Sequence, residues 1–143
     1  MKRLVRENIK DLPYSLHDGV VVDFKIEDDN LIMKFQRGFL KTSKPFKQVE
    51  GSIEIENIDW DFAYVYLIDY EDGICGNVGS FTGTKMELKT FVEQYKKSEF
   101  TLIDETYGYN TSKFDGFIIE GDSFIECMIE IYHLGDMYYL VEE

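Results

Sequence analysis

The chain has 143 residues and a formal charge of −13 at pH 7, with 15% aromatic residues and two prolines. This length fits one domain, 1–143, and the aromatic content favours strands over disorder or a long helical bundle. The charge is uneven, since residues 1–47 carry ten Lys/Arg and seven Asp/Glu, whereas residues 48–143 carry five and 21. The acidic part disfavours DNA and anionic membranes as partners. It would attract a basic protein or a cation, and the favoured alternative is that this charge only keeps the protein soluble.

The N-terminal residues 1–16 contain basic side chains but no apolar segment of the signal-peptide type, and no window is apolar enough to span a membrane. Cys75 and Cys127 lie far apart and form no CxxC pair, which is typical of reduced thiols. The sequence therefore predicts a cytoplasmic protein.

The first structured segment is expected after Pro13, because residues 1–13 read as irregular or as a short helix. Apolar residues then alternate over 20–26 and 31–35, and Asp28-Asp29-Asn30 between them has turn chemistry. This pattern predicts a β-hairpin with a polar outer face. The residues expected to share one face of its first strand are Val20, Val22, Phe24 and Ile26.

Leu16-His17-Asp18 directly precedes this hairpin and its acidic turn. The combination resembles the opening of several small, mostly uncharacterised bacterial protein families, some of them grouped with immunity proteins of polymorphic toxin systems. The resemblance covers about the first quarter of the chain and implies a small cytoplasmic protein that binds a partner. It carries no catalytic residues over to this chain.

A basic segment, 36–48, interrupts the strand pattern and interleaves Arg37, Lys41, Lys44 and Lys47 with Phe39 and Phe46. Such a segment could hold a phosphate while the two rings stack on bases. A solvated loop is the favoured interpretation, because four positive charges stand against a net charge of −13.

Residues 59–70, DWDFAYVYLIDY, are apolar or aromatic at both alternating sets of positions. Since side chains alternate across a strand, the pattern predicts a strand buried on both faces, at the centre of a sheet. A strand over 49–58 with Ile53 and Ile55 inward precedes it.

A glycine-rich connection, 71–84, follows and contains Cys75. Its sequence does not match a phosphate-binding loop, because Gly79 and Gly83 are one residue too close and Lys85 follows Thr84 instead of preceding it. A helix is predicted over 84–97, where Thr84 and Glu87 have capping-box spacing. The apolar stripe of this helix consists of Leu88, Phe91, Val92 and Tyr95.

The remaining chain reads as consecutive strands separated by turn residues, over 100–107, 114–120, 124–133 and 137–141. Together these features predict an α+β fold of mainly antiparallel β structure. We expect about eight strands, in two packed sheets or one curved sheet, and one substantial helix.

No catalytic, metal-binding or cofactor-binding residues are predicted. Glu130 and His133 have E-x-x-H spacing, but in a strand they would point to opposite faces. His17-Asp18 lacks a nucleophile or a second histidine nearby in the sequence. Asp59 and Asp61 beside Trp60 form the best candidate carboxylate pair for glycosidase-like chemistry, which also needs a raised pKa and a cleft.

The remaining candidates are aromatic, and they separate three classes of function. A non-enzymatic protein-binding module, similar to an immunity or inhibitor protein, would bind a basic partner through tyrosines among acidic residues. A small-ligand-binding domain would instead use an aromatic face with Trp60, Tyr64 and Tyr66. A structural or homo-oligomeric module would need no ligand. The candidate protein interface consists of Tyr107, Tyr109, Asp136, Tyr138 and Tyr139.

Overall fold

The computed structural model of the chain describes residues 1–70 and 80–143, and twelve strands and one helix lie in these ranges. Cys75 and most of the glycine-rich connection lie outside the described residues. In chain order the elements are β1 (Lys2–Val5), β2 (Tyr14–Ser15), β3 (Val20–Glu27), β4 (Asn30–Phe35), β5 (Phe39–Lys41), β6 (Lys47–Ile55), β7 (Ile58–Tyr70), β8 (Phe81–Glu87), α1 (Leu88–Tyr95), β9 (Glu99–Gly108), β10 (Thr111–Glu120), β11 (Ser123–His133) and β12 (Met137–Glu142).

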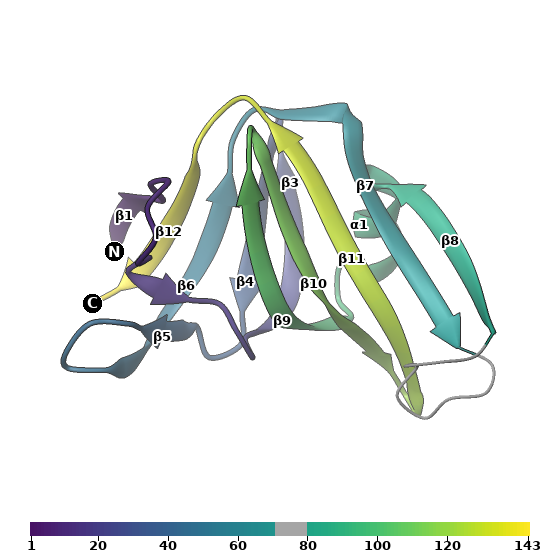
Figure 1. Cartoon of the computed structure of the whole chain (residues 1–143), viewed down its shortest axis with the longest axis horizontal. Coiled ribbons are helices and arrows are strands. Elements are labelled where there is room, and N and C mark those ends of the chain that lie inside the picture. Colours follow the sequence, from purple (N-terminus) through teal and green to yellow (C-terminus); the bar gives the residue numbers. More distant parts are fainter. Residues whose placement is uncertain (71–79) are drawn as a thin grey trace.

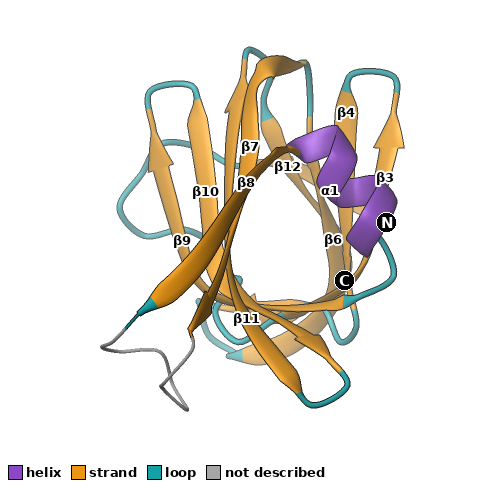
Figure 2. Cartoon of the chain, turned by 90° about the vertical axis from the view of Figure 1, so that its right-hand side faces the viewer, coloured by secondary structure: helices purple, strands orange, loops and turns teal. Residues whose placement is uncertain are grey.

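The strands form one open antiparallel sheet, in the order β1-β12-β6-β4-β3-β9-β10-β11-β7-β8, and β5 joins β2 to β6 beside this path. The prediction of mainly antiparallel structure with one helix is confirmed, whereas the expected eight strands and the two-sheet alternative are wrong. The sheet is strongly curved (Figures 1 and 2). Because of this curvature, α1 contacts β3 as well as β7 and β8, although β9, β10 and β11 separate β3 from β7 in the sheet.

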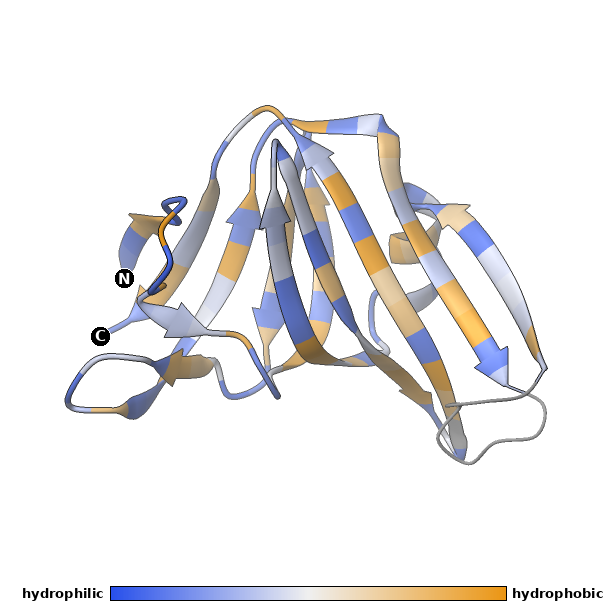
Figure 3. Cartoon of the chain, in the orientation of Figure 1, coloured by the Kyte–Doolittle hydropathy of each residue, from blue (hydrophilic) through white to orange (hydrophobic). Residues whose placement is uncertain are grey.

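One hydrophobic core cluster joins side chains of the sheet and of α1. Apolar and polar bands alternate along β10 and β11 (Figure 3). From β7 the buried side chains are Ala63, Val65 and Leu67. The outer face of this strand is only partly covered, since the Phe62 side chain is 61% exposed. The prediction of a central strand buried on both faces is therefore wrong: β7 is next to the last strand, and its partner β8 forms the edge.

The helix is shorter than predicted, because residues 81–87 pair with β7 as a strand instead of entering the helix. Thr84 lies opposite Leu67 in this pairing, and the first helical residue is Leu88. Glu87 occupies the N-cap position without a side-chain hydrogen bond, so the capping box is not formed. The predicted apolar stripe is confirmed in part, with Leu88, Phe91 and Val92 buried.

Two further expectations at the N-terminal end are corrected. Residues 2–5 form a strand rather than an irregular or helical segment, because they pair with residues 138–141 of β12. In β3 the pairing register shifts between Val21 and Asp23, so the alternation breaks there. As a result Val21 and Phe24 are buried, in place of the regular set from Val20 to Ile26.

Leu16-His17-Asp18 forms a turn that attaches the start of β3 to β9. Leu16 is fully buried, and its backbone N–H donates to the Glu105 carboxylate at 2.7 Å. Asp18 has a positive φ of 64°, and its backbone N–H donates to the Leu102 carbonyl oxygen. Most residues avoid this backbone conformation, and Asp tolerates it better than most. This motif therefore has a structural role in the fold.

None of the described helices is long and apolar enough to cross a membrane.

Candidate binding recess around Trp60

A surface recess of about 400 Å³ lies where three chain segments meet, and Trp60 is part of its lining. The segments are the β3–β4 turn, the start of β7 and the connection between β11 and β12. Their backbones are joined, since the Ile58 N–H donates to the Asp29 carbonyl oxygen at 2.8 Å and the Leu134 N–H donates to the Asn57 carbonyl oxygen at 2.9 Å. Asn57 turns the chain with a φ of 53°. The recess is thus built on hydrogen-bonded backbone.

Three carboxylates surround the apolar part of this recess. Asp29 comes from the β3–β4 turn, and Asp59 and Asp61 come from β7. The Trp60 indole N–H donates to Asp29 Oδ1 at 3.0 Å, and this bond fixes the ring beside the carboxylate. Asp59 Oδ1 accepts the backbone N–H of Asp61 at 3.2 Å. Three residues with formal negative charge therefore line the recess that contains the indole ring.

The apolar side chains of the recess are the indole ring itself, Ile58 and Leu134. Leu134 is 62% exposed and adds an accessible apolar side chain to this lining. The Lys89 ammonium lies 4.7 Å from the centroid of the Trp60 ring. This contact shows that the ring can hold a cation against its face. Carboxylates around an aromatic ring suit a guanidinium or ammonium group.

Of the three residues predicted as a ligand face, Trp60 alone lines this recess. Tyr64 and Tyr66 lie further along β7 and are half-buried beneath Lys85, whose Nζ is 4.1 Å and 5.3 Å from their ring centroids. The Tyr64 hydroxyl donates to the Asp61 carbonyl oxygen. The two tyrosines therefore lie outside the recess and do not line it.

The five predicted interface residues do not form one surface. Tyr139 is fully buried and packs against Tyr14 and Phe39, so it cannot contact a partner. Tyr138 lies under the Arg3 guanidinium, 3.4 Å from its ring centroid. Tyr107 is half-buried, and its hydroxyl donates to Glu105 Oε1 at 2.8 Å, whereas Tyr109 is 88% exposed. Asp136 is exposed at the start of β12.

The basic segment 36–48 does not expose all of the aromatic and basic side chains that could have contacted a nucleic acid. Phe39 is buried against Phe35, Tyr14 and Tyr139, so only Phe46 remains exposed for stacking. Lys41 forms an ion pair with Glu143 at 2.9 Å. The Phe39 ring and the Lys41 ammonium, two of the groups that could have contacted a nucleic acid, are therefore already engaged within the fold.

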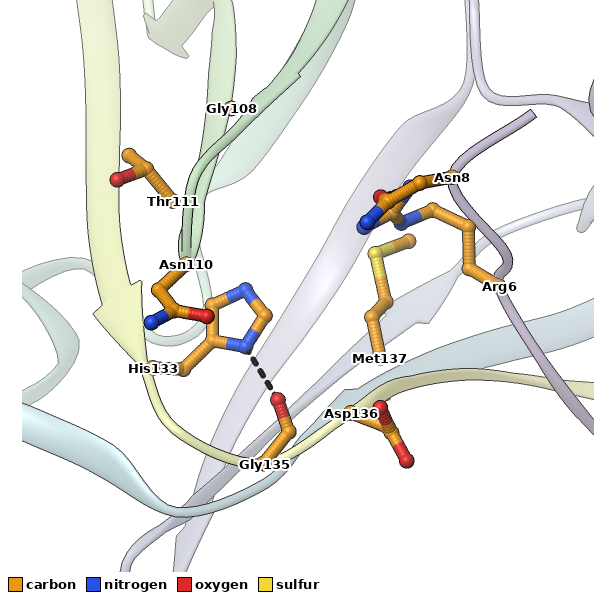
Figure 4. Close-up of a pocket in the computed structure, with 9 residues that line it drawn as sticks. All are labelled: Arg6, Asn8, Gly108, Asn110, Thr111, His133, Gly135, Asp136 and Met137. Atoms are coloured by element: carbon orange, nitrogen blue, oxygen red, sulfur yellow. Dashed lines mark hydrogen bonds between the residues drawn. The ribbon is translucent and has the colours of Figure 1, made fainter. Parts of the chain in front are cut away.

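Sequence reasoning did not find the contact between Ser112 and His133, whose Oγ and Nε2 atoms are 2.8 Å apart. His133 Nδ1 lies 2.8 Å from the Gly135 carbonyl oxygen (Figure 4). Burial lowers the pKa of His133, and Ser112 is fully buried. The pair resembles a nucleophile and its base, but a substrate cannot reach a serine that is fully enclosed. Its two residues are 21 positions apart, and no local spacing indicates such a contact.

In the described ranges, no group of three or more His, Cys, Asp or Glu residues is arranged to hold a metal ion. His17 is exposed and hydrogen-bonds to the Ile103 carbonyl oxygen, with Asp18 Oδ2 3.3 Å from its other ring nitrogen. Comparisons of the chain with family models, curated proteins and solved structures find no match. The geometry of the recess and the charge of the chain are therefore the features that bear on function.

Proposed function

We propose that this protein is a non-enzymatic binding module that holds a basic side chain of a partner protein in the recess around Trp60. The observation that carries the proposal is that Asp29, Asp59 and Asp61 line one recess together with an indole ring and an exposed leucine. An arginine of the partner would replace the Lys89 ammonium on the ring while its N–H groups donate to the carboxylates.

The charge of the whole chain supports a basic partner. Residues 48–143 carry 21 acidic and five basic residues, and this field would steer a positively charged protein towards the surface. A tryptophan anchor is also among the residues enriched at interface centres. The resemblance of Leu16-His17-Asp18 and its hairpin to immunity-associated families agrees with this class of function. It stays a prediction, because the comparisons provide no family.

Trp60 makes the proposal directly measurable, because it is the only tryptophan in the chain. An acetylated, amidated peptide with one arginine between glycines should change the Trp60 fluorescence on titration, and the same peptide with glutamine should not. For a protein partner, candidates recovered at low salt from the native cells would be purified and titrated in the same way. Binding should weaken as salt is raised, because exposed charges are screened.

The decisive variant is Asp59→Asn/Asp61→Asn, which removes two charges while keeping the shape of the side chains. We expect it to weaken peptide and partner binding by about tenfold or more, since two charge-assisted hydrogen bonds would be lost. The matched control is Glu50→Gln/Glu120→Gln, which removes the same charge at exposed positions outside the recess. If both variants weakened binding equally, the loss would come from the overall charge of the protein, and the proposed site would be wrong.

The second candidate is a small cationic ligand, because the recess volume of about 400 Å³ is within the range of ligand sites. A thermal shift from a metabolite amine that also changes Trp60 fluorescence, without any partner protein, would favour this class. A homo-oligomeric role would instead appear as a concentration-dependent mass in sedimentation experiments.

A further inference from the structure

A second recess, of about 450 Å³, lies beside the segment 6–13 that connects β1 to β2, which we call the strap. The strap leaves β12 where the Arg6 N–H donates to the Met137 carbonyl oxygen at 2.7 Å, and it reaches β5 where the Thr42 N–H donates to the Pro13 carbonyl oxygen at 3.0 Å. Between these points it faces the end of β9. The recess lies between the strap and residues 107–109.

Arg6 is the central cation of this recess. Its guanidinium carbon lies 3.9 Å from the Tyr107 ring centroid, and Nη1 donates to Asn8 Oδ1 at 3.1 Å. Its Nε atom is buried and has no hydrogen-bond partner. Buried donors are nearly always paired, so this N–H is an exception in the described part of the chain.

The acidic groups described near Arg6 form no direct ion pair with it. Among residues 1–70 and 80–143 no carboxylate forms an ion pair with Arg6, although the chain contains 28 acidic residues. Glu105 is nearby, but its two oxygens accept the Leu16 N–H and the Tyr107 hydroxyl. Asp136 shares a smaller adjoining cavity of about 90 Å³ with Arg6, and its carboxylate points away from the guanidinium (Figure 4).

Two other side chains complete the recess. Lys10 adds a second exposed cation and forms no ion pair in the described part of the chain. Tyr109, at the β9–β10 turn, is 88% exposed and presents an uncovered ring. Residues 1–13 carry four Lys/Arg and two Asp/Glu, so the local charge opposes that of the remaining chain.

We propose that this recess binds a small aromatic oxyanion, with its phosphate or carboxylate held by Arg6 and Lys10 and its ring against Tyr109. Arginine forms charge-assisted hydrogen bonds with such oxyanions through its terminal N–H groups. A tyrosine ring stacks on a planar ligand. A nucleic-acid polymer is disfavoured, because the net charge of −13 repels a polyanion.

The test uses three probes and isothermal titration calorimetry at low salt. Phenyl phosphate carries both the ring and the anion, inorganic phosphate carries the anion alone, and phenol carries the ring alone. We expect phenyl phosphate to bind about threefold or more tighter than inorganic phosphate, and phenol not to bind measurably. Equal binding of phenyl phosphate and phosphate would overturn the role of the ring, and no binding of either would overturn the site.

Variants then locate the site. Arg6→Gln should weaken phenyl phosphate binding by about tenfold, and Lys10→Gln should weaken it less. The matched control is Arg37→Gln, which removes one exposed cation from a segment outside the recess.

Because Arg6 also packs on Tyr107, Arg6→Gln could disturb the fold. Tyr109→Ala keeps the test valid in that case, since the Tyr109 side chain is almost fully exposed. We expect Tyr109→Ala to reduce the affinity for phenyl phosphate to that for phosphate. Unchanged affinity in both Tyr109→Ala and Lys10→Gln, or an equal loss in Arg37→Gln, would exclude this recess.

Discussion

Ser112 donates a hydrogen bond to His133 inside the molecule, over 2.8 Å between Oγ and Nε2. The direction follows from the other ring nitrogen, because the Gly135 carbonyl oxygen can only accept and Nδ1 must therefore carry the hydrogen. Burial lowers the pKa of His133, which agrees with a neutral ring. These two contacts attach the connection between β11 and β12 to β10. The connection contributes Leu134 to the Trp60 recess and Asp136 to the cavity beside Arg6.

Replacing Ser112 by alanine should destabilise the protein by about 1–3 kcal/mol, because His133 Nε2 would remain buried without a donor. Urea unfolding followed by circular dichroism measures this change. Ser43→Ala, at an exposed loop position, is the control and should stay within about 0.5 kcal/mol of the wild type. A Ser112→Ala protein as stable as the control would mean that the ring finds another donor.

The pH dependence of stability should report on Glu143. Its carboxylate accepts hydrogen bonds from Lys41 at 2.9 Å and from the Tyr14 hydroxyl at 2.8 Å, and these contacts lower its pKa to about 2. As pH falls below about 4.5, the unfolded chain binds a proton at this residue while the folded chain does not. The stabilisation is thus present above that pH and is lost progressively as pH falls towards 2.

The measurement for Glu143 is the free energy of unfolding between pH 5 and pH 2. Glu143→Gln should reduce the slope of this free energy against pH. Glu50→Gln, at an exposed position of β6, should keep the wild-type slope. If Glu143→Gln kept the wild-type slope, the contact with Lys41 and Tyr14 would not persist in solution.

Gly116 should not tolerate a side chain. It lies at the register shift between β9 and β10, and a Cβ added there would be 1.9 Å from the Thr101 carbonyl oxygen. Since a backbone atom cannot move away alone, Gly116→Ala should cost about 2 kcal/mol or more in the free energy of unfolding. Gly83→Ala on β8 is the control, because its nearest neighbour would be 3.8 Å away. Thermal unfolding of both variants compares them, and similar midpoints would contradict the close approach.

The helix should depend on Phe91 for its attachment to the sheet. This side chain is fully buried and meets Phe24 of β3 edge to face, with ring centroids 5.3 Å apart. Phe91→Ala should destabilise the protein by about 3–5 kcal/mol, while Glu93→Ala on the exposed side of the same helix should have little effect. Denaturant titration of the pair provides the comparison. A small loss at Phe91 would indicate that α1 contributes little to the core.

The periodicity of the sequence predicted which residues face the core wherever a strand or helix is regular. Ile53 and Ile55 are buried in β6, and the stripe of Leu88, Phe91 and Val92 is buried in α1. It failed where a neighbouring strand changes the backbone. Residues 84–87 belong to the predicted helix, but pairing with β7 satisfies their backbone groups as a strand. The register shift after Val21 likewise comes from the pairing partner and has no signal in β3 itself.

The sequence by itself determined the mainly antiparallel class, the single helix and the concentration of negative charge, because alternation, helical spacing and composition are properties of neighbouring residues. It also singled out Trp60 with Asp59 and Asp61, since these are adjacent. Only the tertiary structure decided that Asp29 and Leu134 join them, that Tyr139 is buried, and that Arg6 lies over Tyr107. These contacts join residues far apart in the chain, and they depend on strand order, register and curvature, which local sequence patterns do not encode.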